Sequence, residues 1–258
     1  MKLSISTTAR AVIDAYLHIR IGLQEVSCPY FNNRRTKLRA SLRALVGKGS
    51  PEDIAEEANI LALKEKIDLS HTSQAAVRRF LVDHHLGVDC SAFAYYVLDA
   101  ECRARQRGRL RDYLVFAGLP FPRRLIASFR PIENTSVRTL ADERNSFVVA
   151  LSDVKPADIV IMLGAGESRD RDHLLVVEEV EYTDNQPTNI TYAHSLRWRT
   201  DGQCNHGVRH GRIELAPTNA SLLDVGWIEQ DKFGEENETF TRATGAQCLE
   251  IRRLKALA

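Results

Sequence analysis

The sequence predicts an α+β fold in which helices come first and a largely antiparallel sheet follows. Up to about residue 107, apolar side chains recur at helical spacing. From residue 145 onward, short runs rich in Val, Ile, Tyr and Leu are separated by turn clusters of Gly, Asn, Asp and Pro. Helices and strands grouped in this way, without a regular βα alternation, are typical of α+β proteins with antiparallel pairing.

Four amphipathic helices are expected ahead of residue 88, each with a recognisable boundary. Pro29 ends the first, Gly47 supplies a left-handed cap for the second, and Ser50 caps the third. The fourth is capped by Thr72 or Ser73. The second helix is expected over 36–46, and the third is expected to end at about residue 67. The expected apolar faces consist of Val12, Tyr16, Ile19 and Leu23 in the first helix, Leu38, Leu42 and Leu45 in the second, and Val77, Phe80 and Leu81 in the fourth.

A fifth helix is expected to begin at Cys90, directly after Asp89, and to continue to about Arg107. Cys90, Phe93 and Val97 share its apolar face. The strands expected after it cover 158–163, 173–182, 190–196, 208–215 and 247–254.

The composition is that of an ordered globular protein. Of 258 residues, 44% are hydrophobic and 27% are charged, and the net charge is +1, so binding to nucleic acid or to an anionic membrane needs a local patch. No apolar stretch approaches the roughly 18 residues of a spanning helix, and residues 1–23 lack a signal-peptide pattern. We therefore expect a cytoplasmic protein with neither a membrane nor a nucleic-acid partner. The five cysteines are scattered and odd in number, which predicts free thiols.

Cys90 is a candidate nucleophile because it lies in the first turn of a helix. There the unpaired amide hydrogens and the helix dipole favour the thiolate, and such thiols have pKa values lowered to roughly 3.5–7.5. A nucleophile also needs a base, and a third group to orient the base. His173 opens one expected strand and His194 lies in the next. A hairpin turn near residues 184–187 puts Trp198 opposite His173, four positions beyond His194, and a bulge at the turn would change that offset.

Four segments, taken in order, resemble the motifs of NlpC-type papain-like cysteine peptidases. That family carries an Asp-Cys-Ser-Gly-Phe helix start, a Pro-Gly-Asp strand, a His at the head of the following strand and a polar third residue one strand later. The likeness covers about residues 83–200, with Ala92 and Ala157 standing where the family has Gly. The matching segments are Asp89-Cys90-Ser91-Ala92-Phe93, Lys155-Pro156-Ala157-Asp158-Ile159-Val160, Asp172-His173-Leu174-Leu175-Val176-Val177 and Tyr192-Ala193-His194-Ser195.

The resemblance implies a papain-like hydrolase domain over 81–258. Residues 1–80 match nothing in the family pattern, but their apolar faces, which include Val77, Phe80 and Leu81 just before the Cys90 helix, need burial, so we expect this helical extension to dock on the domain beside the cleft. The resemblance also implies that Cys90 attacks an amide carbonyl, that His173 acts as base and then acid, and that His194 orients His173. The substrate implied is a peptidoglycan stem peptide or another short peptide, with no cofactor and no metal. Asp89, Ser91 and Ser195 are assigned to the substrate or oxyanion region. Asp89 is also expected to cap the helix by accepting from the amide of Ser91 or Ala92.

Other interpretations stay open at this point. The chain could be a catalytically inactive papain-like binding protein that contacts its partner through the helical extension or the Arg-rich stretch 103–130, although a helix flank paired with Asp and Glu also explains those arginines. Cys90 could be a small buried hydrophobe. Cys204, His206 and His210, joined by His84-His85, have spacings that a structural zinc could use. Gly164-Ala165-Gly166 lacks the setting of a phosphate loop and is expected to be an ordinary turn.

Overall fold

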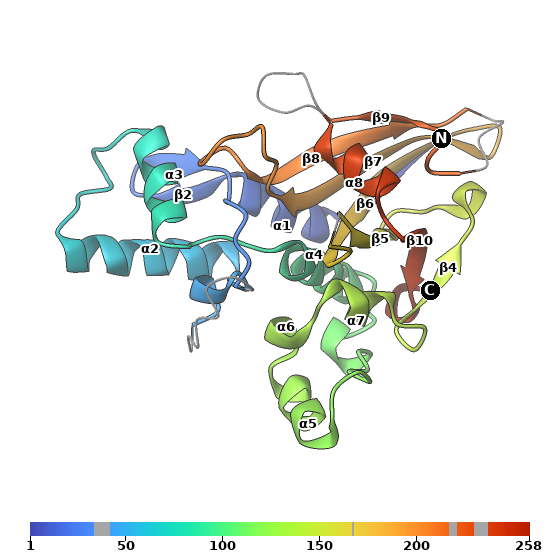
Figure 1. Ribbon diagram of the computed structural model, residues 1–258, viewed down its shortest axis with the longest axis horizontal. Coiled ribbons are helices and arrows are strands. Elements are labelled where there is room, and N and C mark those ends of the chain that lie inside the picture. The colour runs from blue at the N-terminus through green and yellow to red at the C-terminus, as the bar shows by residue number, and fades with distance from the viewer. Residues whose placement is uncertain (34–41, 167, 217–220, 230–236) are drawn as a thin grey trace.

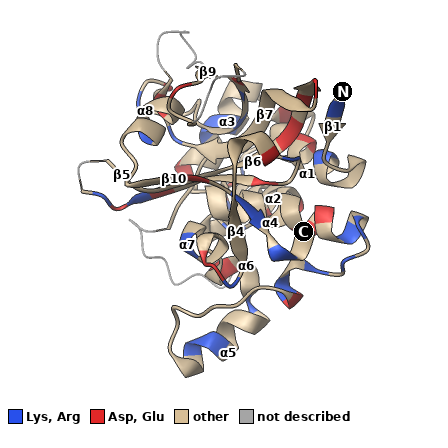
Figure 2. Ribbon diagram, turned by 90° about the vertical axis from the view of Figure 1, so that its right-hand side faces the viewer, with Lys and Arg blue, Asp and Glu red and all other residues tan. Residues whose placement is uncertain are grey.

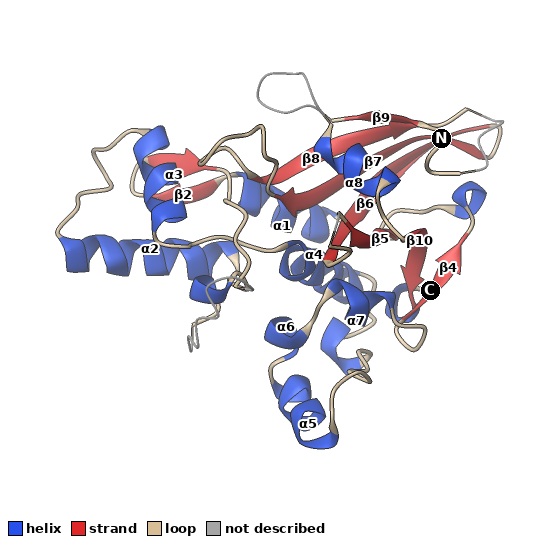
Figure 3. Ribbon diagram, viewed as in Figure 1, coloured by secondary structure: helices blue, strands red, loops and turns tan. Residues whose placement is uncertain are grey.

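The computed structural model describes residues 1–33, 42–166, 168–216, 221–229 and 237–258. A twisted sheet forms one side of the molecule, and most of the helices gather on the other (Figures 1 and 3). The helices are α1 (Thr7–Leu17), α2 (Pro51–Glu65), α3 (Gln74–Asp83), α4 (Cys90–Ala104), α5 (Phe121–Phe129), α6 (Pro131–Asn134), α7 (Val137–Ala141) and α8 (Glu238–Thr244).

The sheet is antiparallel at every pairing in the described chain, which confirms the α+β prediction. Its strands run in the order β4-β10-β5-β6-β7-β8-β9, and β1 adds to β6. A separate hairpin joins β2 (Ile19–Ile21) to β3 (Gln24–Val26). The strands of the main sheet are β1 (Lys2–Ser4), β4 (Ser146–Val149), β5 (Ile159–Ala165), β6 (Arg171–Thr183), β7 (Gln186–Leu196), β8 (Gly207–Glu214), β9 (Gly226–Ile228) and β10 (Cys248–Leu254).

The first helix is shorter than predicted. It ends at Leu17, and the β2–β3 hairpin occupies the residues that were expected to continue it to Leu23. Ile19 and Ile21 are buried while Arg20 between them is exposed, which is the alternation of a strand. Gly22 then turns the chain with a φ of +59°, and a side chain there would collide with the backbone of Ser70.

The other helix boundaries follow the capping signals. Ser50 caps α2 with a reciprocal capping box, Ser73 caps α3, and Asp89 caps α4. Gly47 has the expected left-handed conformation, with a φ of 74°, after a short 3-10 helix at Ala44–Val46. Most of the second helix, expected over 36–46, lies outside the described residues.

The core is organised around α4, which has buried side chains on most of its faces. Tyr16 of α1 packs edge-on against Phe93 of α4, with ring centroids 5.5 Å apart. One apolar cluster joins α1, α2, α3 and α4 to Leu174 and Val176 of β6, and a second includes Leu175 of β6. The described part of the first 80 residues therefore shares a core with α4 and supplies a strand to the main sheet. The division of the chain into domains at residue 80 stays a prediction.

Ala157 and Ala92, the two alanines that replace Gly in the family pattern, differ in backbone conformation: Ala157 is left-handed and Ala92 is helical. Ala157 has a φ of +73°, a left-handed conformation that costs a residue with a Cβ roughly 1–2 kcal/mol. Ala92 lies in the first turn of α4, where Gly is less favourable than Ala by about 0.5–1 kcal/mol. We expect Ala157→Gly to raise the free energy of unfolding by about 1 kcal/mol and Ala92→Gly to lower it, both measured by urea denaturation. A lower stability for Ala157→Gly would show that the left-handed backbone is not strained.

Candidate active site

Cys90 borders a groove that is lined by both polar and apolar residues. It is the first residue of α4, and it helps to line a groove with a volume of about 810 Å³. Lys48 and Thr135 line the groove beside it, and Arg138 and Asp172 form an ion pair along its wall, with Nε and Oδ2 2.7 Å apart. Cys90 thus contributes to the wall of the groove, although only 5% of the residue is exposed.

Several contacts fix the backbone that precedes α4. Val88 bridges to both Tyr30 and Lys48, and its amide donates to the carbonyl of Pro29 at 3.0 Å. The hydroxyl of Ser195 donates to the carbonyl of Val88 at 2.8 Å. Ser195 is fully buried, so the structure places it as a support for the start of α4.

Asp89 has the capping role that its position predicts, and a buried lysine neutralises it. Its Oδ1 accepts from the amide of Ala92 at 2.8 Å and from the hydroxyl of Ser91 at 2.9 Å. Lys48 Nζ lies 2.8 Å from Asp89 Oδ2 and also donates to Ser91 Oγ and the carbonyl of Thr135. Because this ammonium offsets the carboxylate, Asp89 opposes ionisation of the neighbouring thiol less than an unpaired acid would.

The expected lowering of the Cys90 pKa is wrong for the free protein. Burial, followed by the charge of Asp89, raises the pKa of the Cys90 thiol to about 12, against the opposing effects of Lys48 and an amide hydrogen bond. That hydrogen bond comes from the backbone of Leu174, the residue after His173. Position at a helix start is thus outweighed by desolvation, and the free protein holds Cys90 as a neutral thiol.

His173 and His194 come together across neighbouring strands. Asp184 and Asn185 form the β6–β7 turn, both with positive φ, and Val176 pairs with Ala193. Continuing this register puts His194 opposite Leu175, two positions from His173 rather than the four expected. The two rings are therefore diagonal neighbours on one face of the sheet. Nε2 of His173 lies 2.8 Å from Nδ1 of His194.

Glu229 extends this pair into a chain of hydrogen bonds. It follows β9, and its Oε1 lies 2.9 Å from Nε2 of His194. Its Oε2 accepts from the hydroxyl of Tyr192 at 2.6 Å, and Arg209 lies 3.9 Å from Oε1. Burial opposes ionisation, but His194 and Tyr192 outweigh it and lower the pKa of Glu229. Glu229 follows a strand of only three residues, and the sequence around it contains no pattern that would indicate a contact with His194.

The Cys90 thiol contacts β6 one residue away from His173. The Cys90 sulfur contacts the amide of Leu174, one residue from His173, and the charge of Arg242 on α8 acts on both Cys90 and His173. Burial, with the neighbouring His194 and Arg242, lowers the pKa of His173 well below its usual value. Among the described residues no hydrogen bond joins Cys90 Sγ to His173. Both groups are neutral, and Cys90 contacts β6 at the backbone of Leu174 rather than at the His173 ring.

The histidines considered for zinc have other partners. His206 Nδ1 accepts from the amide of Tyr30 at 3.1 Å, His210 pairs with Glu178, and His84 pairs with Glu65. No group of three or more His, Cys, Asp or Glu side chains in the described ranges has a metal-binding arrangement. That the chain uses no metal stays a prediction.

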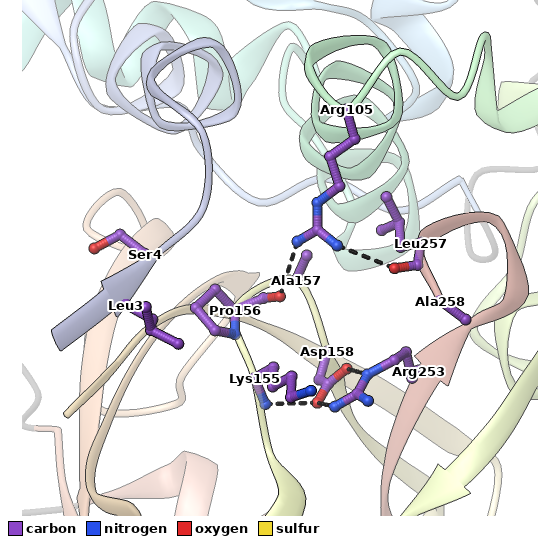
Figure 4. Close-up of a pocket in the computed structure, with 10 residues that line it drawn as sticks. All are labelled: Leu3, Ser4, Arg105, Lys155, Pro156, Ala157, Asp158, Arg253, Leu257 and Ala258. Carbon is purple, nitrogen blue, oxygen red and sulfur yellow. Dashed lines mark hydrogen bonds and ion pairs between the residues drawn. The ribbon is translucent and has the colours of Figure 1, made fainter. Parts of the chain in front are cut away.

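A second pocket lies at the opposite end of α4. It has a volume of about 310 Å³, and Figure 4 shows Arg105 over it, donating to the carbonyls of Leu257 and Pro156. On its floor, Arg253 and the amide of Lys155 bind the carboxylate of Asp158. Cys90 and Arg105 are separated by the length of a 15-residue helix, about 22 Å. This pocket is therefore remote from the thiol and the two histidines.

Comparison with protein-family models, with curated proteins and with solved structures finds no match to this chain. The NlpC-type resemblance accordingly rests on the four sequence segments. What the site does must follow from the chemistry of its own residues.

Acid should destabilise the fold through its buried neutral histidines. Burial, followed by Arg197 and Arg78, lowers the pKa of His206 to about 4, against about 6.5 in an unfolded chain. The unfolded state therefore binds the proton first, so this contribution is complete above pH 6.5 and is lost as the pH falls toward 4. Protonation of His206 would also put a hydrogen on Nδ1, which could then no longer accept from the amide of Tyr30.

We expect His206→Gln to reduce the loss of unfolding free energy between pH 7 and pH 4.5 by about 2–3 kcal/mol. Urea denaturation at the two pH values measures this difference. His71→Gln is the matched control, because the His71 side chain is exposed. An equal pH dependence in the wild type and in His206→Gln would contradict the assignment of a lowered pKa to His206.

Proposed function

We propose that the chain is a thiol-dependent hydrolase of amide bonds, with Cys90 as nucleophile, His173 as base and His194 as the group that orients His173. The observation that carries this proposal is the hydrogen-bonded chain His173–His194–Glu229, which ends one residue from the contact between the Cys90 sulfur and β6. A nucleophile, a base and an orienting group are the parts that acyl transfer needs. The four sequence segments that resemble NlpC-type peptidases assign the same three residues.

The hydrogen-bond chain decides which nitrogen of His173 can take a proton. Glu229 as a carboxylate can only accept, so Nε2 of His194 carries a hydrogen. When His194 is neutral, its Nδ1 is an acceptor, and the hydrogen between the rings belongs to Nε2 of His173. Nδ1 of His173 is left with a free lone pair. Glu229 thus acts through two rings as a positioning residue for the base.

The proposed reaction starts from a neutral pair. As Cys90 Sγ forms a bond to the amide carbonyl carbon, its proton passes to Nδ1 of His173, and His194 with Glu229 stabilises the resulting imidazolium. The amide of Cys90 is at the first helical position, has no partner within its own helix, and is available to the oxyanion. His173 returns the proton to the leaving amine, which departs as the carbon–nitrogen bond breaks. His173 then takes a proton from water, the hydroxide attacks the thioester, and the acid leaves as the thiol is restored.

The groove favours a short peptide that carries both charges. Lys48, Arg130 and Arg138 contribute cations to its walls, and Asp172 and Glu133 contribute carboxylates. A peptide with free amino and carboxyl groups matches such a surface, and peptidoglycan stem peptides belong to this class. We propose them, or a related short peptide, as the substrate.

An inactive binding protein with the same groove is the second candidate. The raised pKa and the burial of Cys90 are the observations that favour it. In that case the thiol serves as a buried small side chain and the groove alone binds the peptide.

Acylation by an activated ester distinguishes the two candidates without knowledge of the substrate. After incubation with p-nitrophenyl acetate at neutral pH, intact mass and peptide mapping should show one acetyl group on Cys90, and Cys90→Ala should remove it. Cys102→Ala is the matched control, because Cys102 is a buried thiol of the same helix. Acetylation of Cys204 or Cys248 with Cys90 unmodified would favour the binding protein.

A further inference from the structure

Helix α5 presents its apolar side to solvent. Phe121, Leu125 and Phe129 follow one another at helical spacing and are 79%, 56% and 77% exposed, and Ile126 beside them is 56% exposed. Ala127, on the opposite side of the helix, is fully buried. A surface helix normally turns its apolar stripe toward the core. In α5 this orientation is reversed.

The surroundings of this apolar face are basic. α5 contains Arg123 and Arg124 and no acid, and Arg130 follows it directly. Arg111, in the segment before α5, is also exposed, with Asp112 beside it. In Figure 2 part of the α5 ribbon is blue for Lys and Arg, and in both Figure 1 and Figure 2 α5 lies at the end of the molecule away from β9. Arg123 lies on the other side of α5 from the exposed apolar face, and Arg124 lies beside that face and donates to the carbonyls of Ala117 and Leu119. The apolar and basic residues therefore belong to one exposed amphipathic helix.

We propose that α5 docks on the surface of an anionic lipid bilayer, with Phe121, Leu125 and Phe129 inserted at the interface and Arg123 and Arg124 on lipid phosphates. Helices with Phe and Leu on one face and Arg on the polar face lie in the bilayer interface in this way. The cations disfavour a second copy of this chain as the occupant, since its α5 would bring the same charges. A nine-residue helix, about 14 Å long, is also small for a stable protein interface, which takes about 800 Å² from each partner.

This surface contact differs from spanning a bilayer. No helix in the described residues is long and apolar enough to cross a membrane. The net charge of +1 gives no general attraction to anionic lipid, so the contact depends on the α5 face alone. Ile126 and Arg130 also line the groove that holds Cys90, and docking would place the groove beside the lipid headgroups. The docking proposal does not depend on the proposed hydrolase activity.

Vesicle co-sedimentation of the full chain tests the proposal. The protein should bind vesicles of equimolar phosphatidylcholine and phosphatidylglycerol, bind vesicles of phosphatidylcholine alone at least about tenfold more weakly, and dissociate as salt is raised. Phe121→Ser with Phe129→Ser should weaken binding by at least about tenfold, and Arg123→Gln with Arg124→Gln should do the same. Phe147→Ser, which removes a partly exposed Phe from β4, should leave binding unchanged.

Three results would overturn the docking proposal. The first is no binding to the anionic vesicles at low salt by wild-type protein that melts cooperatively. The second is binding to polyglutamate as tight as to the vesicles and insensitive to the two Phe substitutions, which would indicate a general polyanion site. The third is a dimer in vesicle-free solution that Phe121→Ser with Phe129→Ser dissociates, which would assign the face to a second copy.

Discussion

Replacing His173 with Gln is expected to slow the acetylation of Cys90 by a factor of about 10²–10⁴, the usual contribution of a positioned base. The thiol has a pKa of about 12, so almost none is ionised at neutral pH and the reaction depends on proton transfer. Gln keeps an N–H that can donate to Nδ1 of His194, but it cannot accept the proton as imidazole does. Mass spectrometry of Cys90 over time gives the rate.

Two further variants test whether the slower acetylation is specific to loss of the His173 base. His71→Gln should react at the wild-type rate, because His71 is exposed and pairs with Asp68 near it in sequence. His173→Ala should be as slow as His173→Gln if loss of the base is the cause. A Cys90 acetylation rate in folded His173→Gln that equals the wild-type rate would remove His173 from the mechanism.

Replacing Lys48 with Met is expected to lower the free energy of unfolding by about 3–5 kcal/mol. The Lys48 ammonium and the Asp89 carboxylate are 11% and 9% exposed, and loss of one partner leaves the other charge buried without compensation. The same ammonium also donates to Ser91 and to the carbonyl of Thr135, so two further groups lose a partner. Chemical denaturation measures the change.

A double-mutant cycle separates the ion pair from simple packing. Lys48→Met combined with Asp89→Asn should be less destabilised than the sum of the single changes, by about 1–3 kcal/mol. Lys2→Met is the matched control, because Lys2 pairs with Glu179 at the surface and its loss should cost under about 1 kcal/mol. Strict additivity of the Lys48 and Asp89 substitutions would show that the pair does not support the start of α4.

The sequence could predict the elements whose boundaries depend on local chemistry. Ser50, Ser73 and Asp89 cap their helices as the pattern indicates, because a cap satisfies amides only two or three residues away. The apolar strands β5, β6, β7, β8 and β10 also lie within a few residues of their predicted positions. The nearness of His173 and His194 followed from their strands, although the turn at Asp184 and Asn185 changed the offset.

The features that the sequence could not predict depend on distant parts of the chain. Glu229 meets His194 only because β8 and β9 bring it back across the sheet, and nothing near it in sequence marks that role. Lys48 reaches Asp89 from 41 residues away. The pKa of Cys90 depends on how deeply α4 is buried, which overrides the effect of its helix position.

The most direct test of the account is the nitrogen NMR spectrum of His173 and His194 in isotopically labelled protein, with each ring assigned by substitution. At neutral pH, Nδ1 of His173 should carry no hydrogen, Nε2 of both rings should carry one, and Glu229→Gln should disturb this pattern in both rings. A hydrogen on Nδ1 of His173 in the wild type, or a pattern unchanged in Glu229→Gln, would contradict the claim that Glu229 and His194 hold His173 ready to take the proton of Cys90.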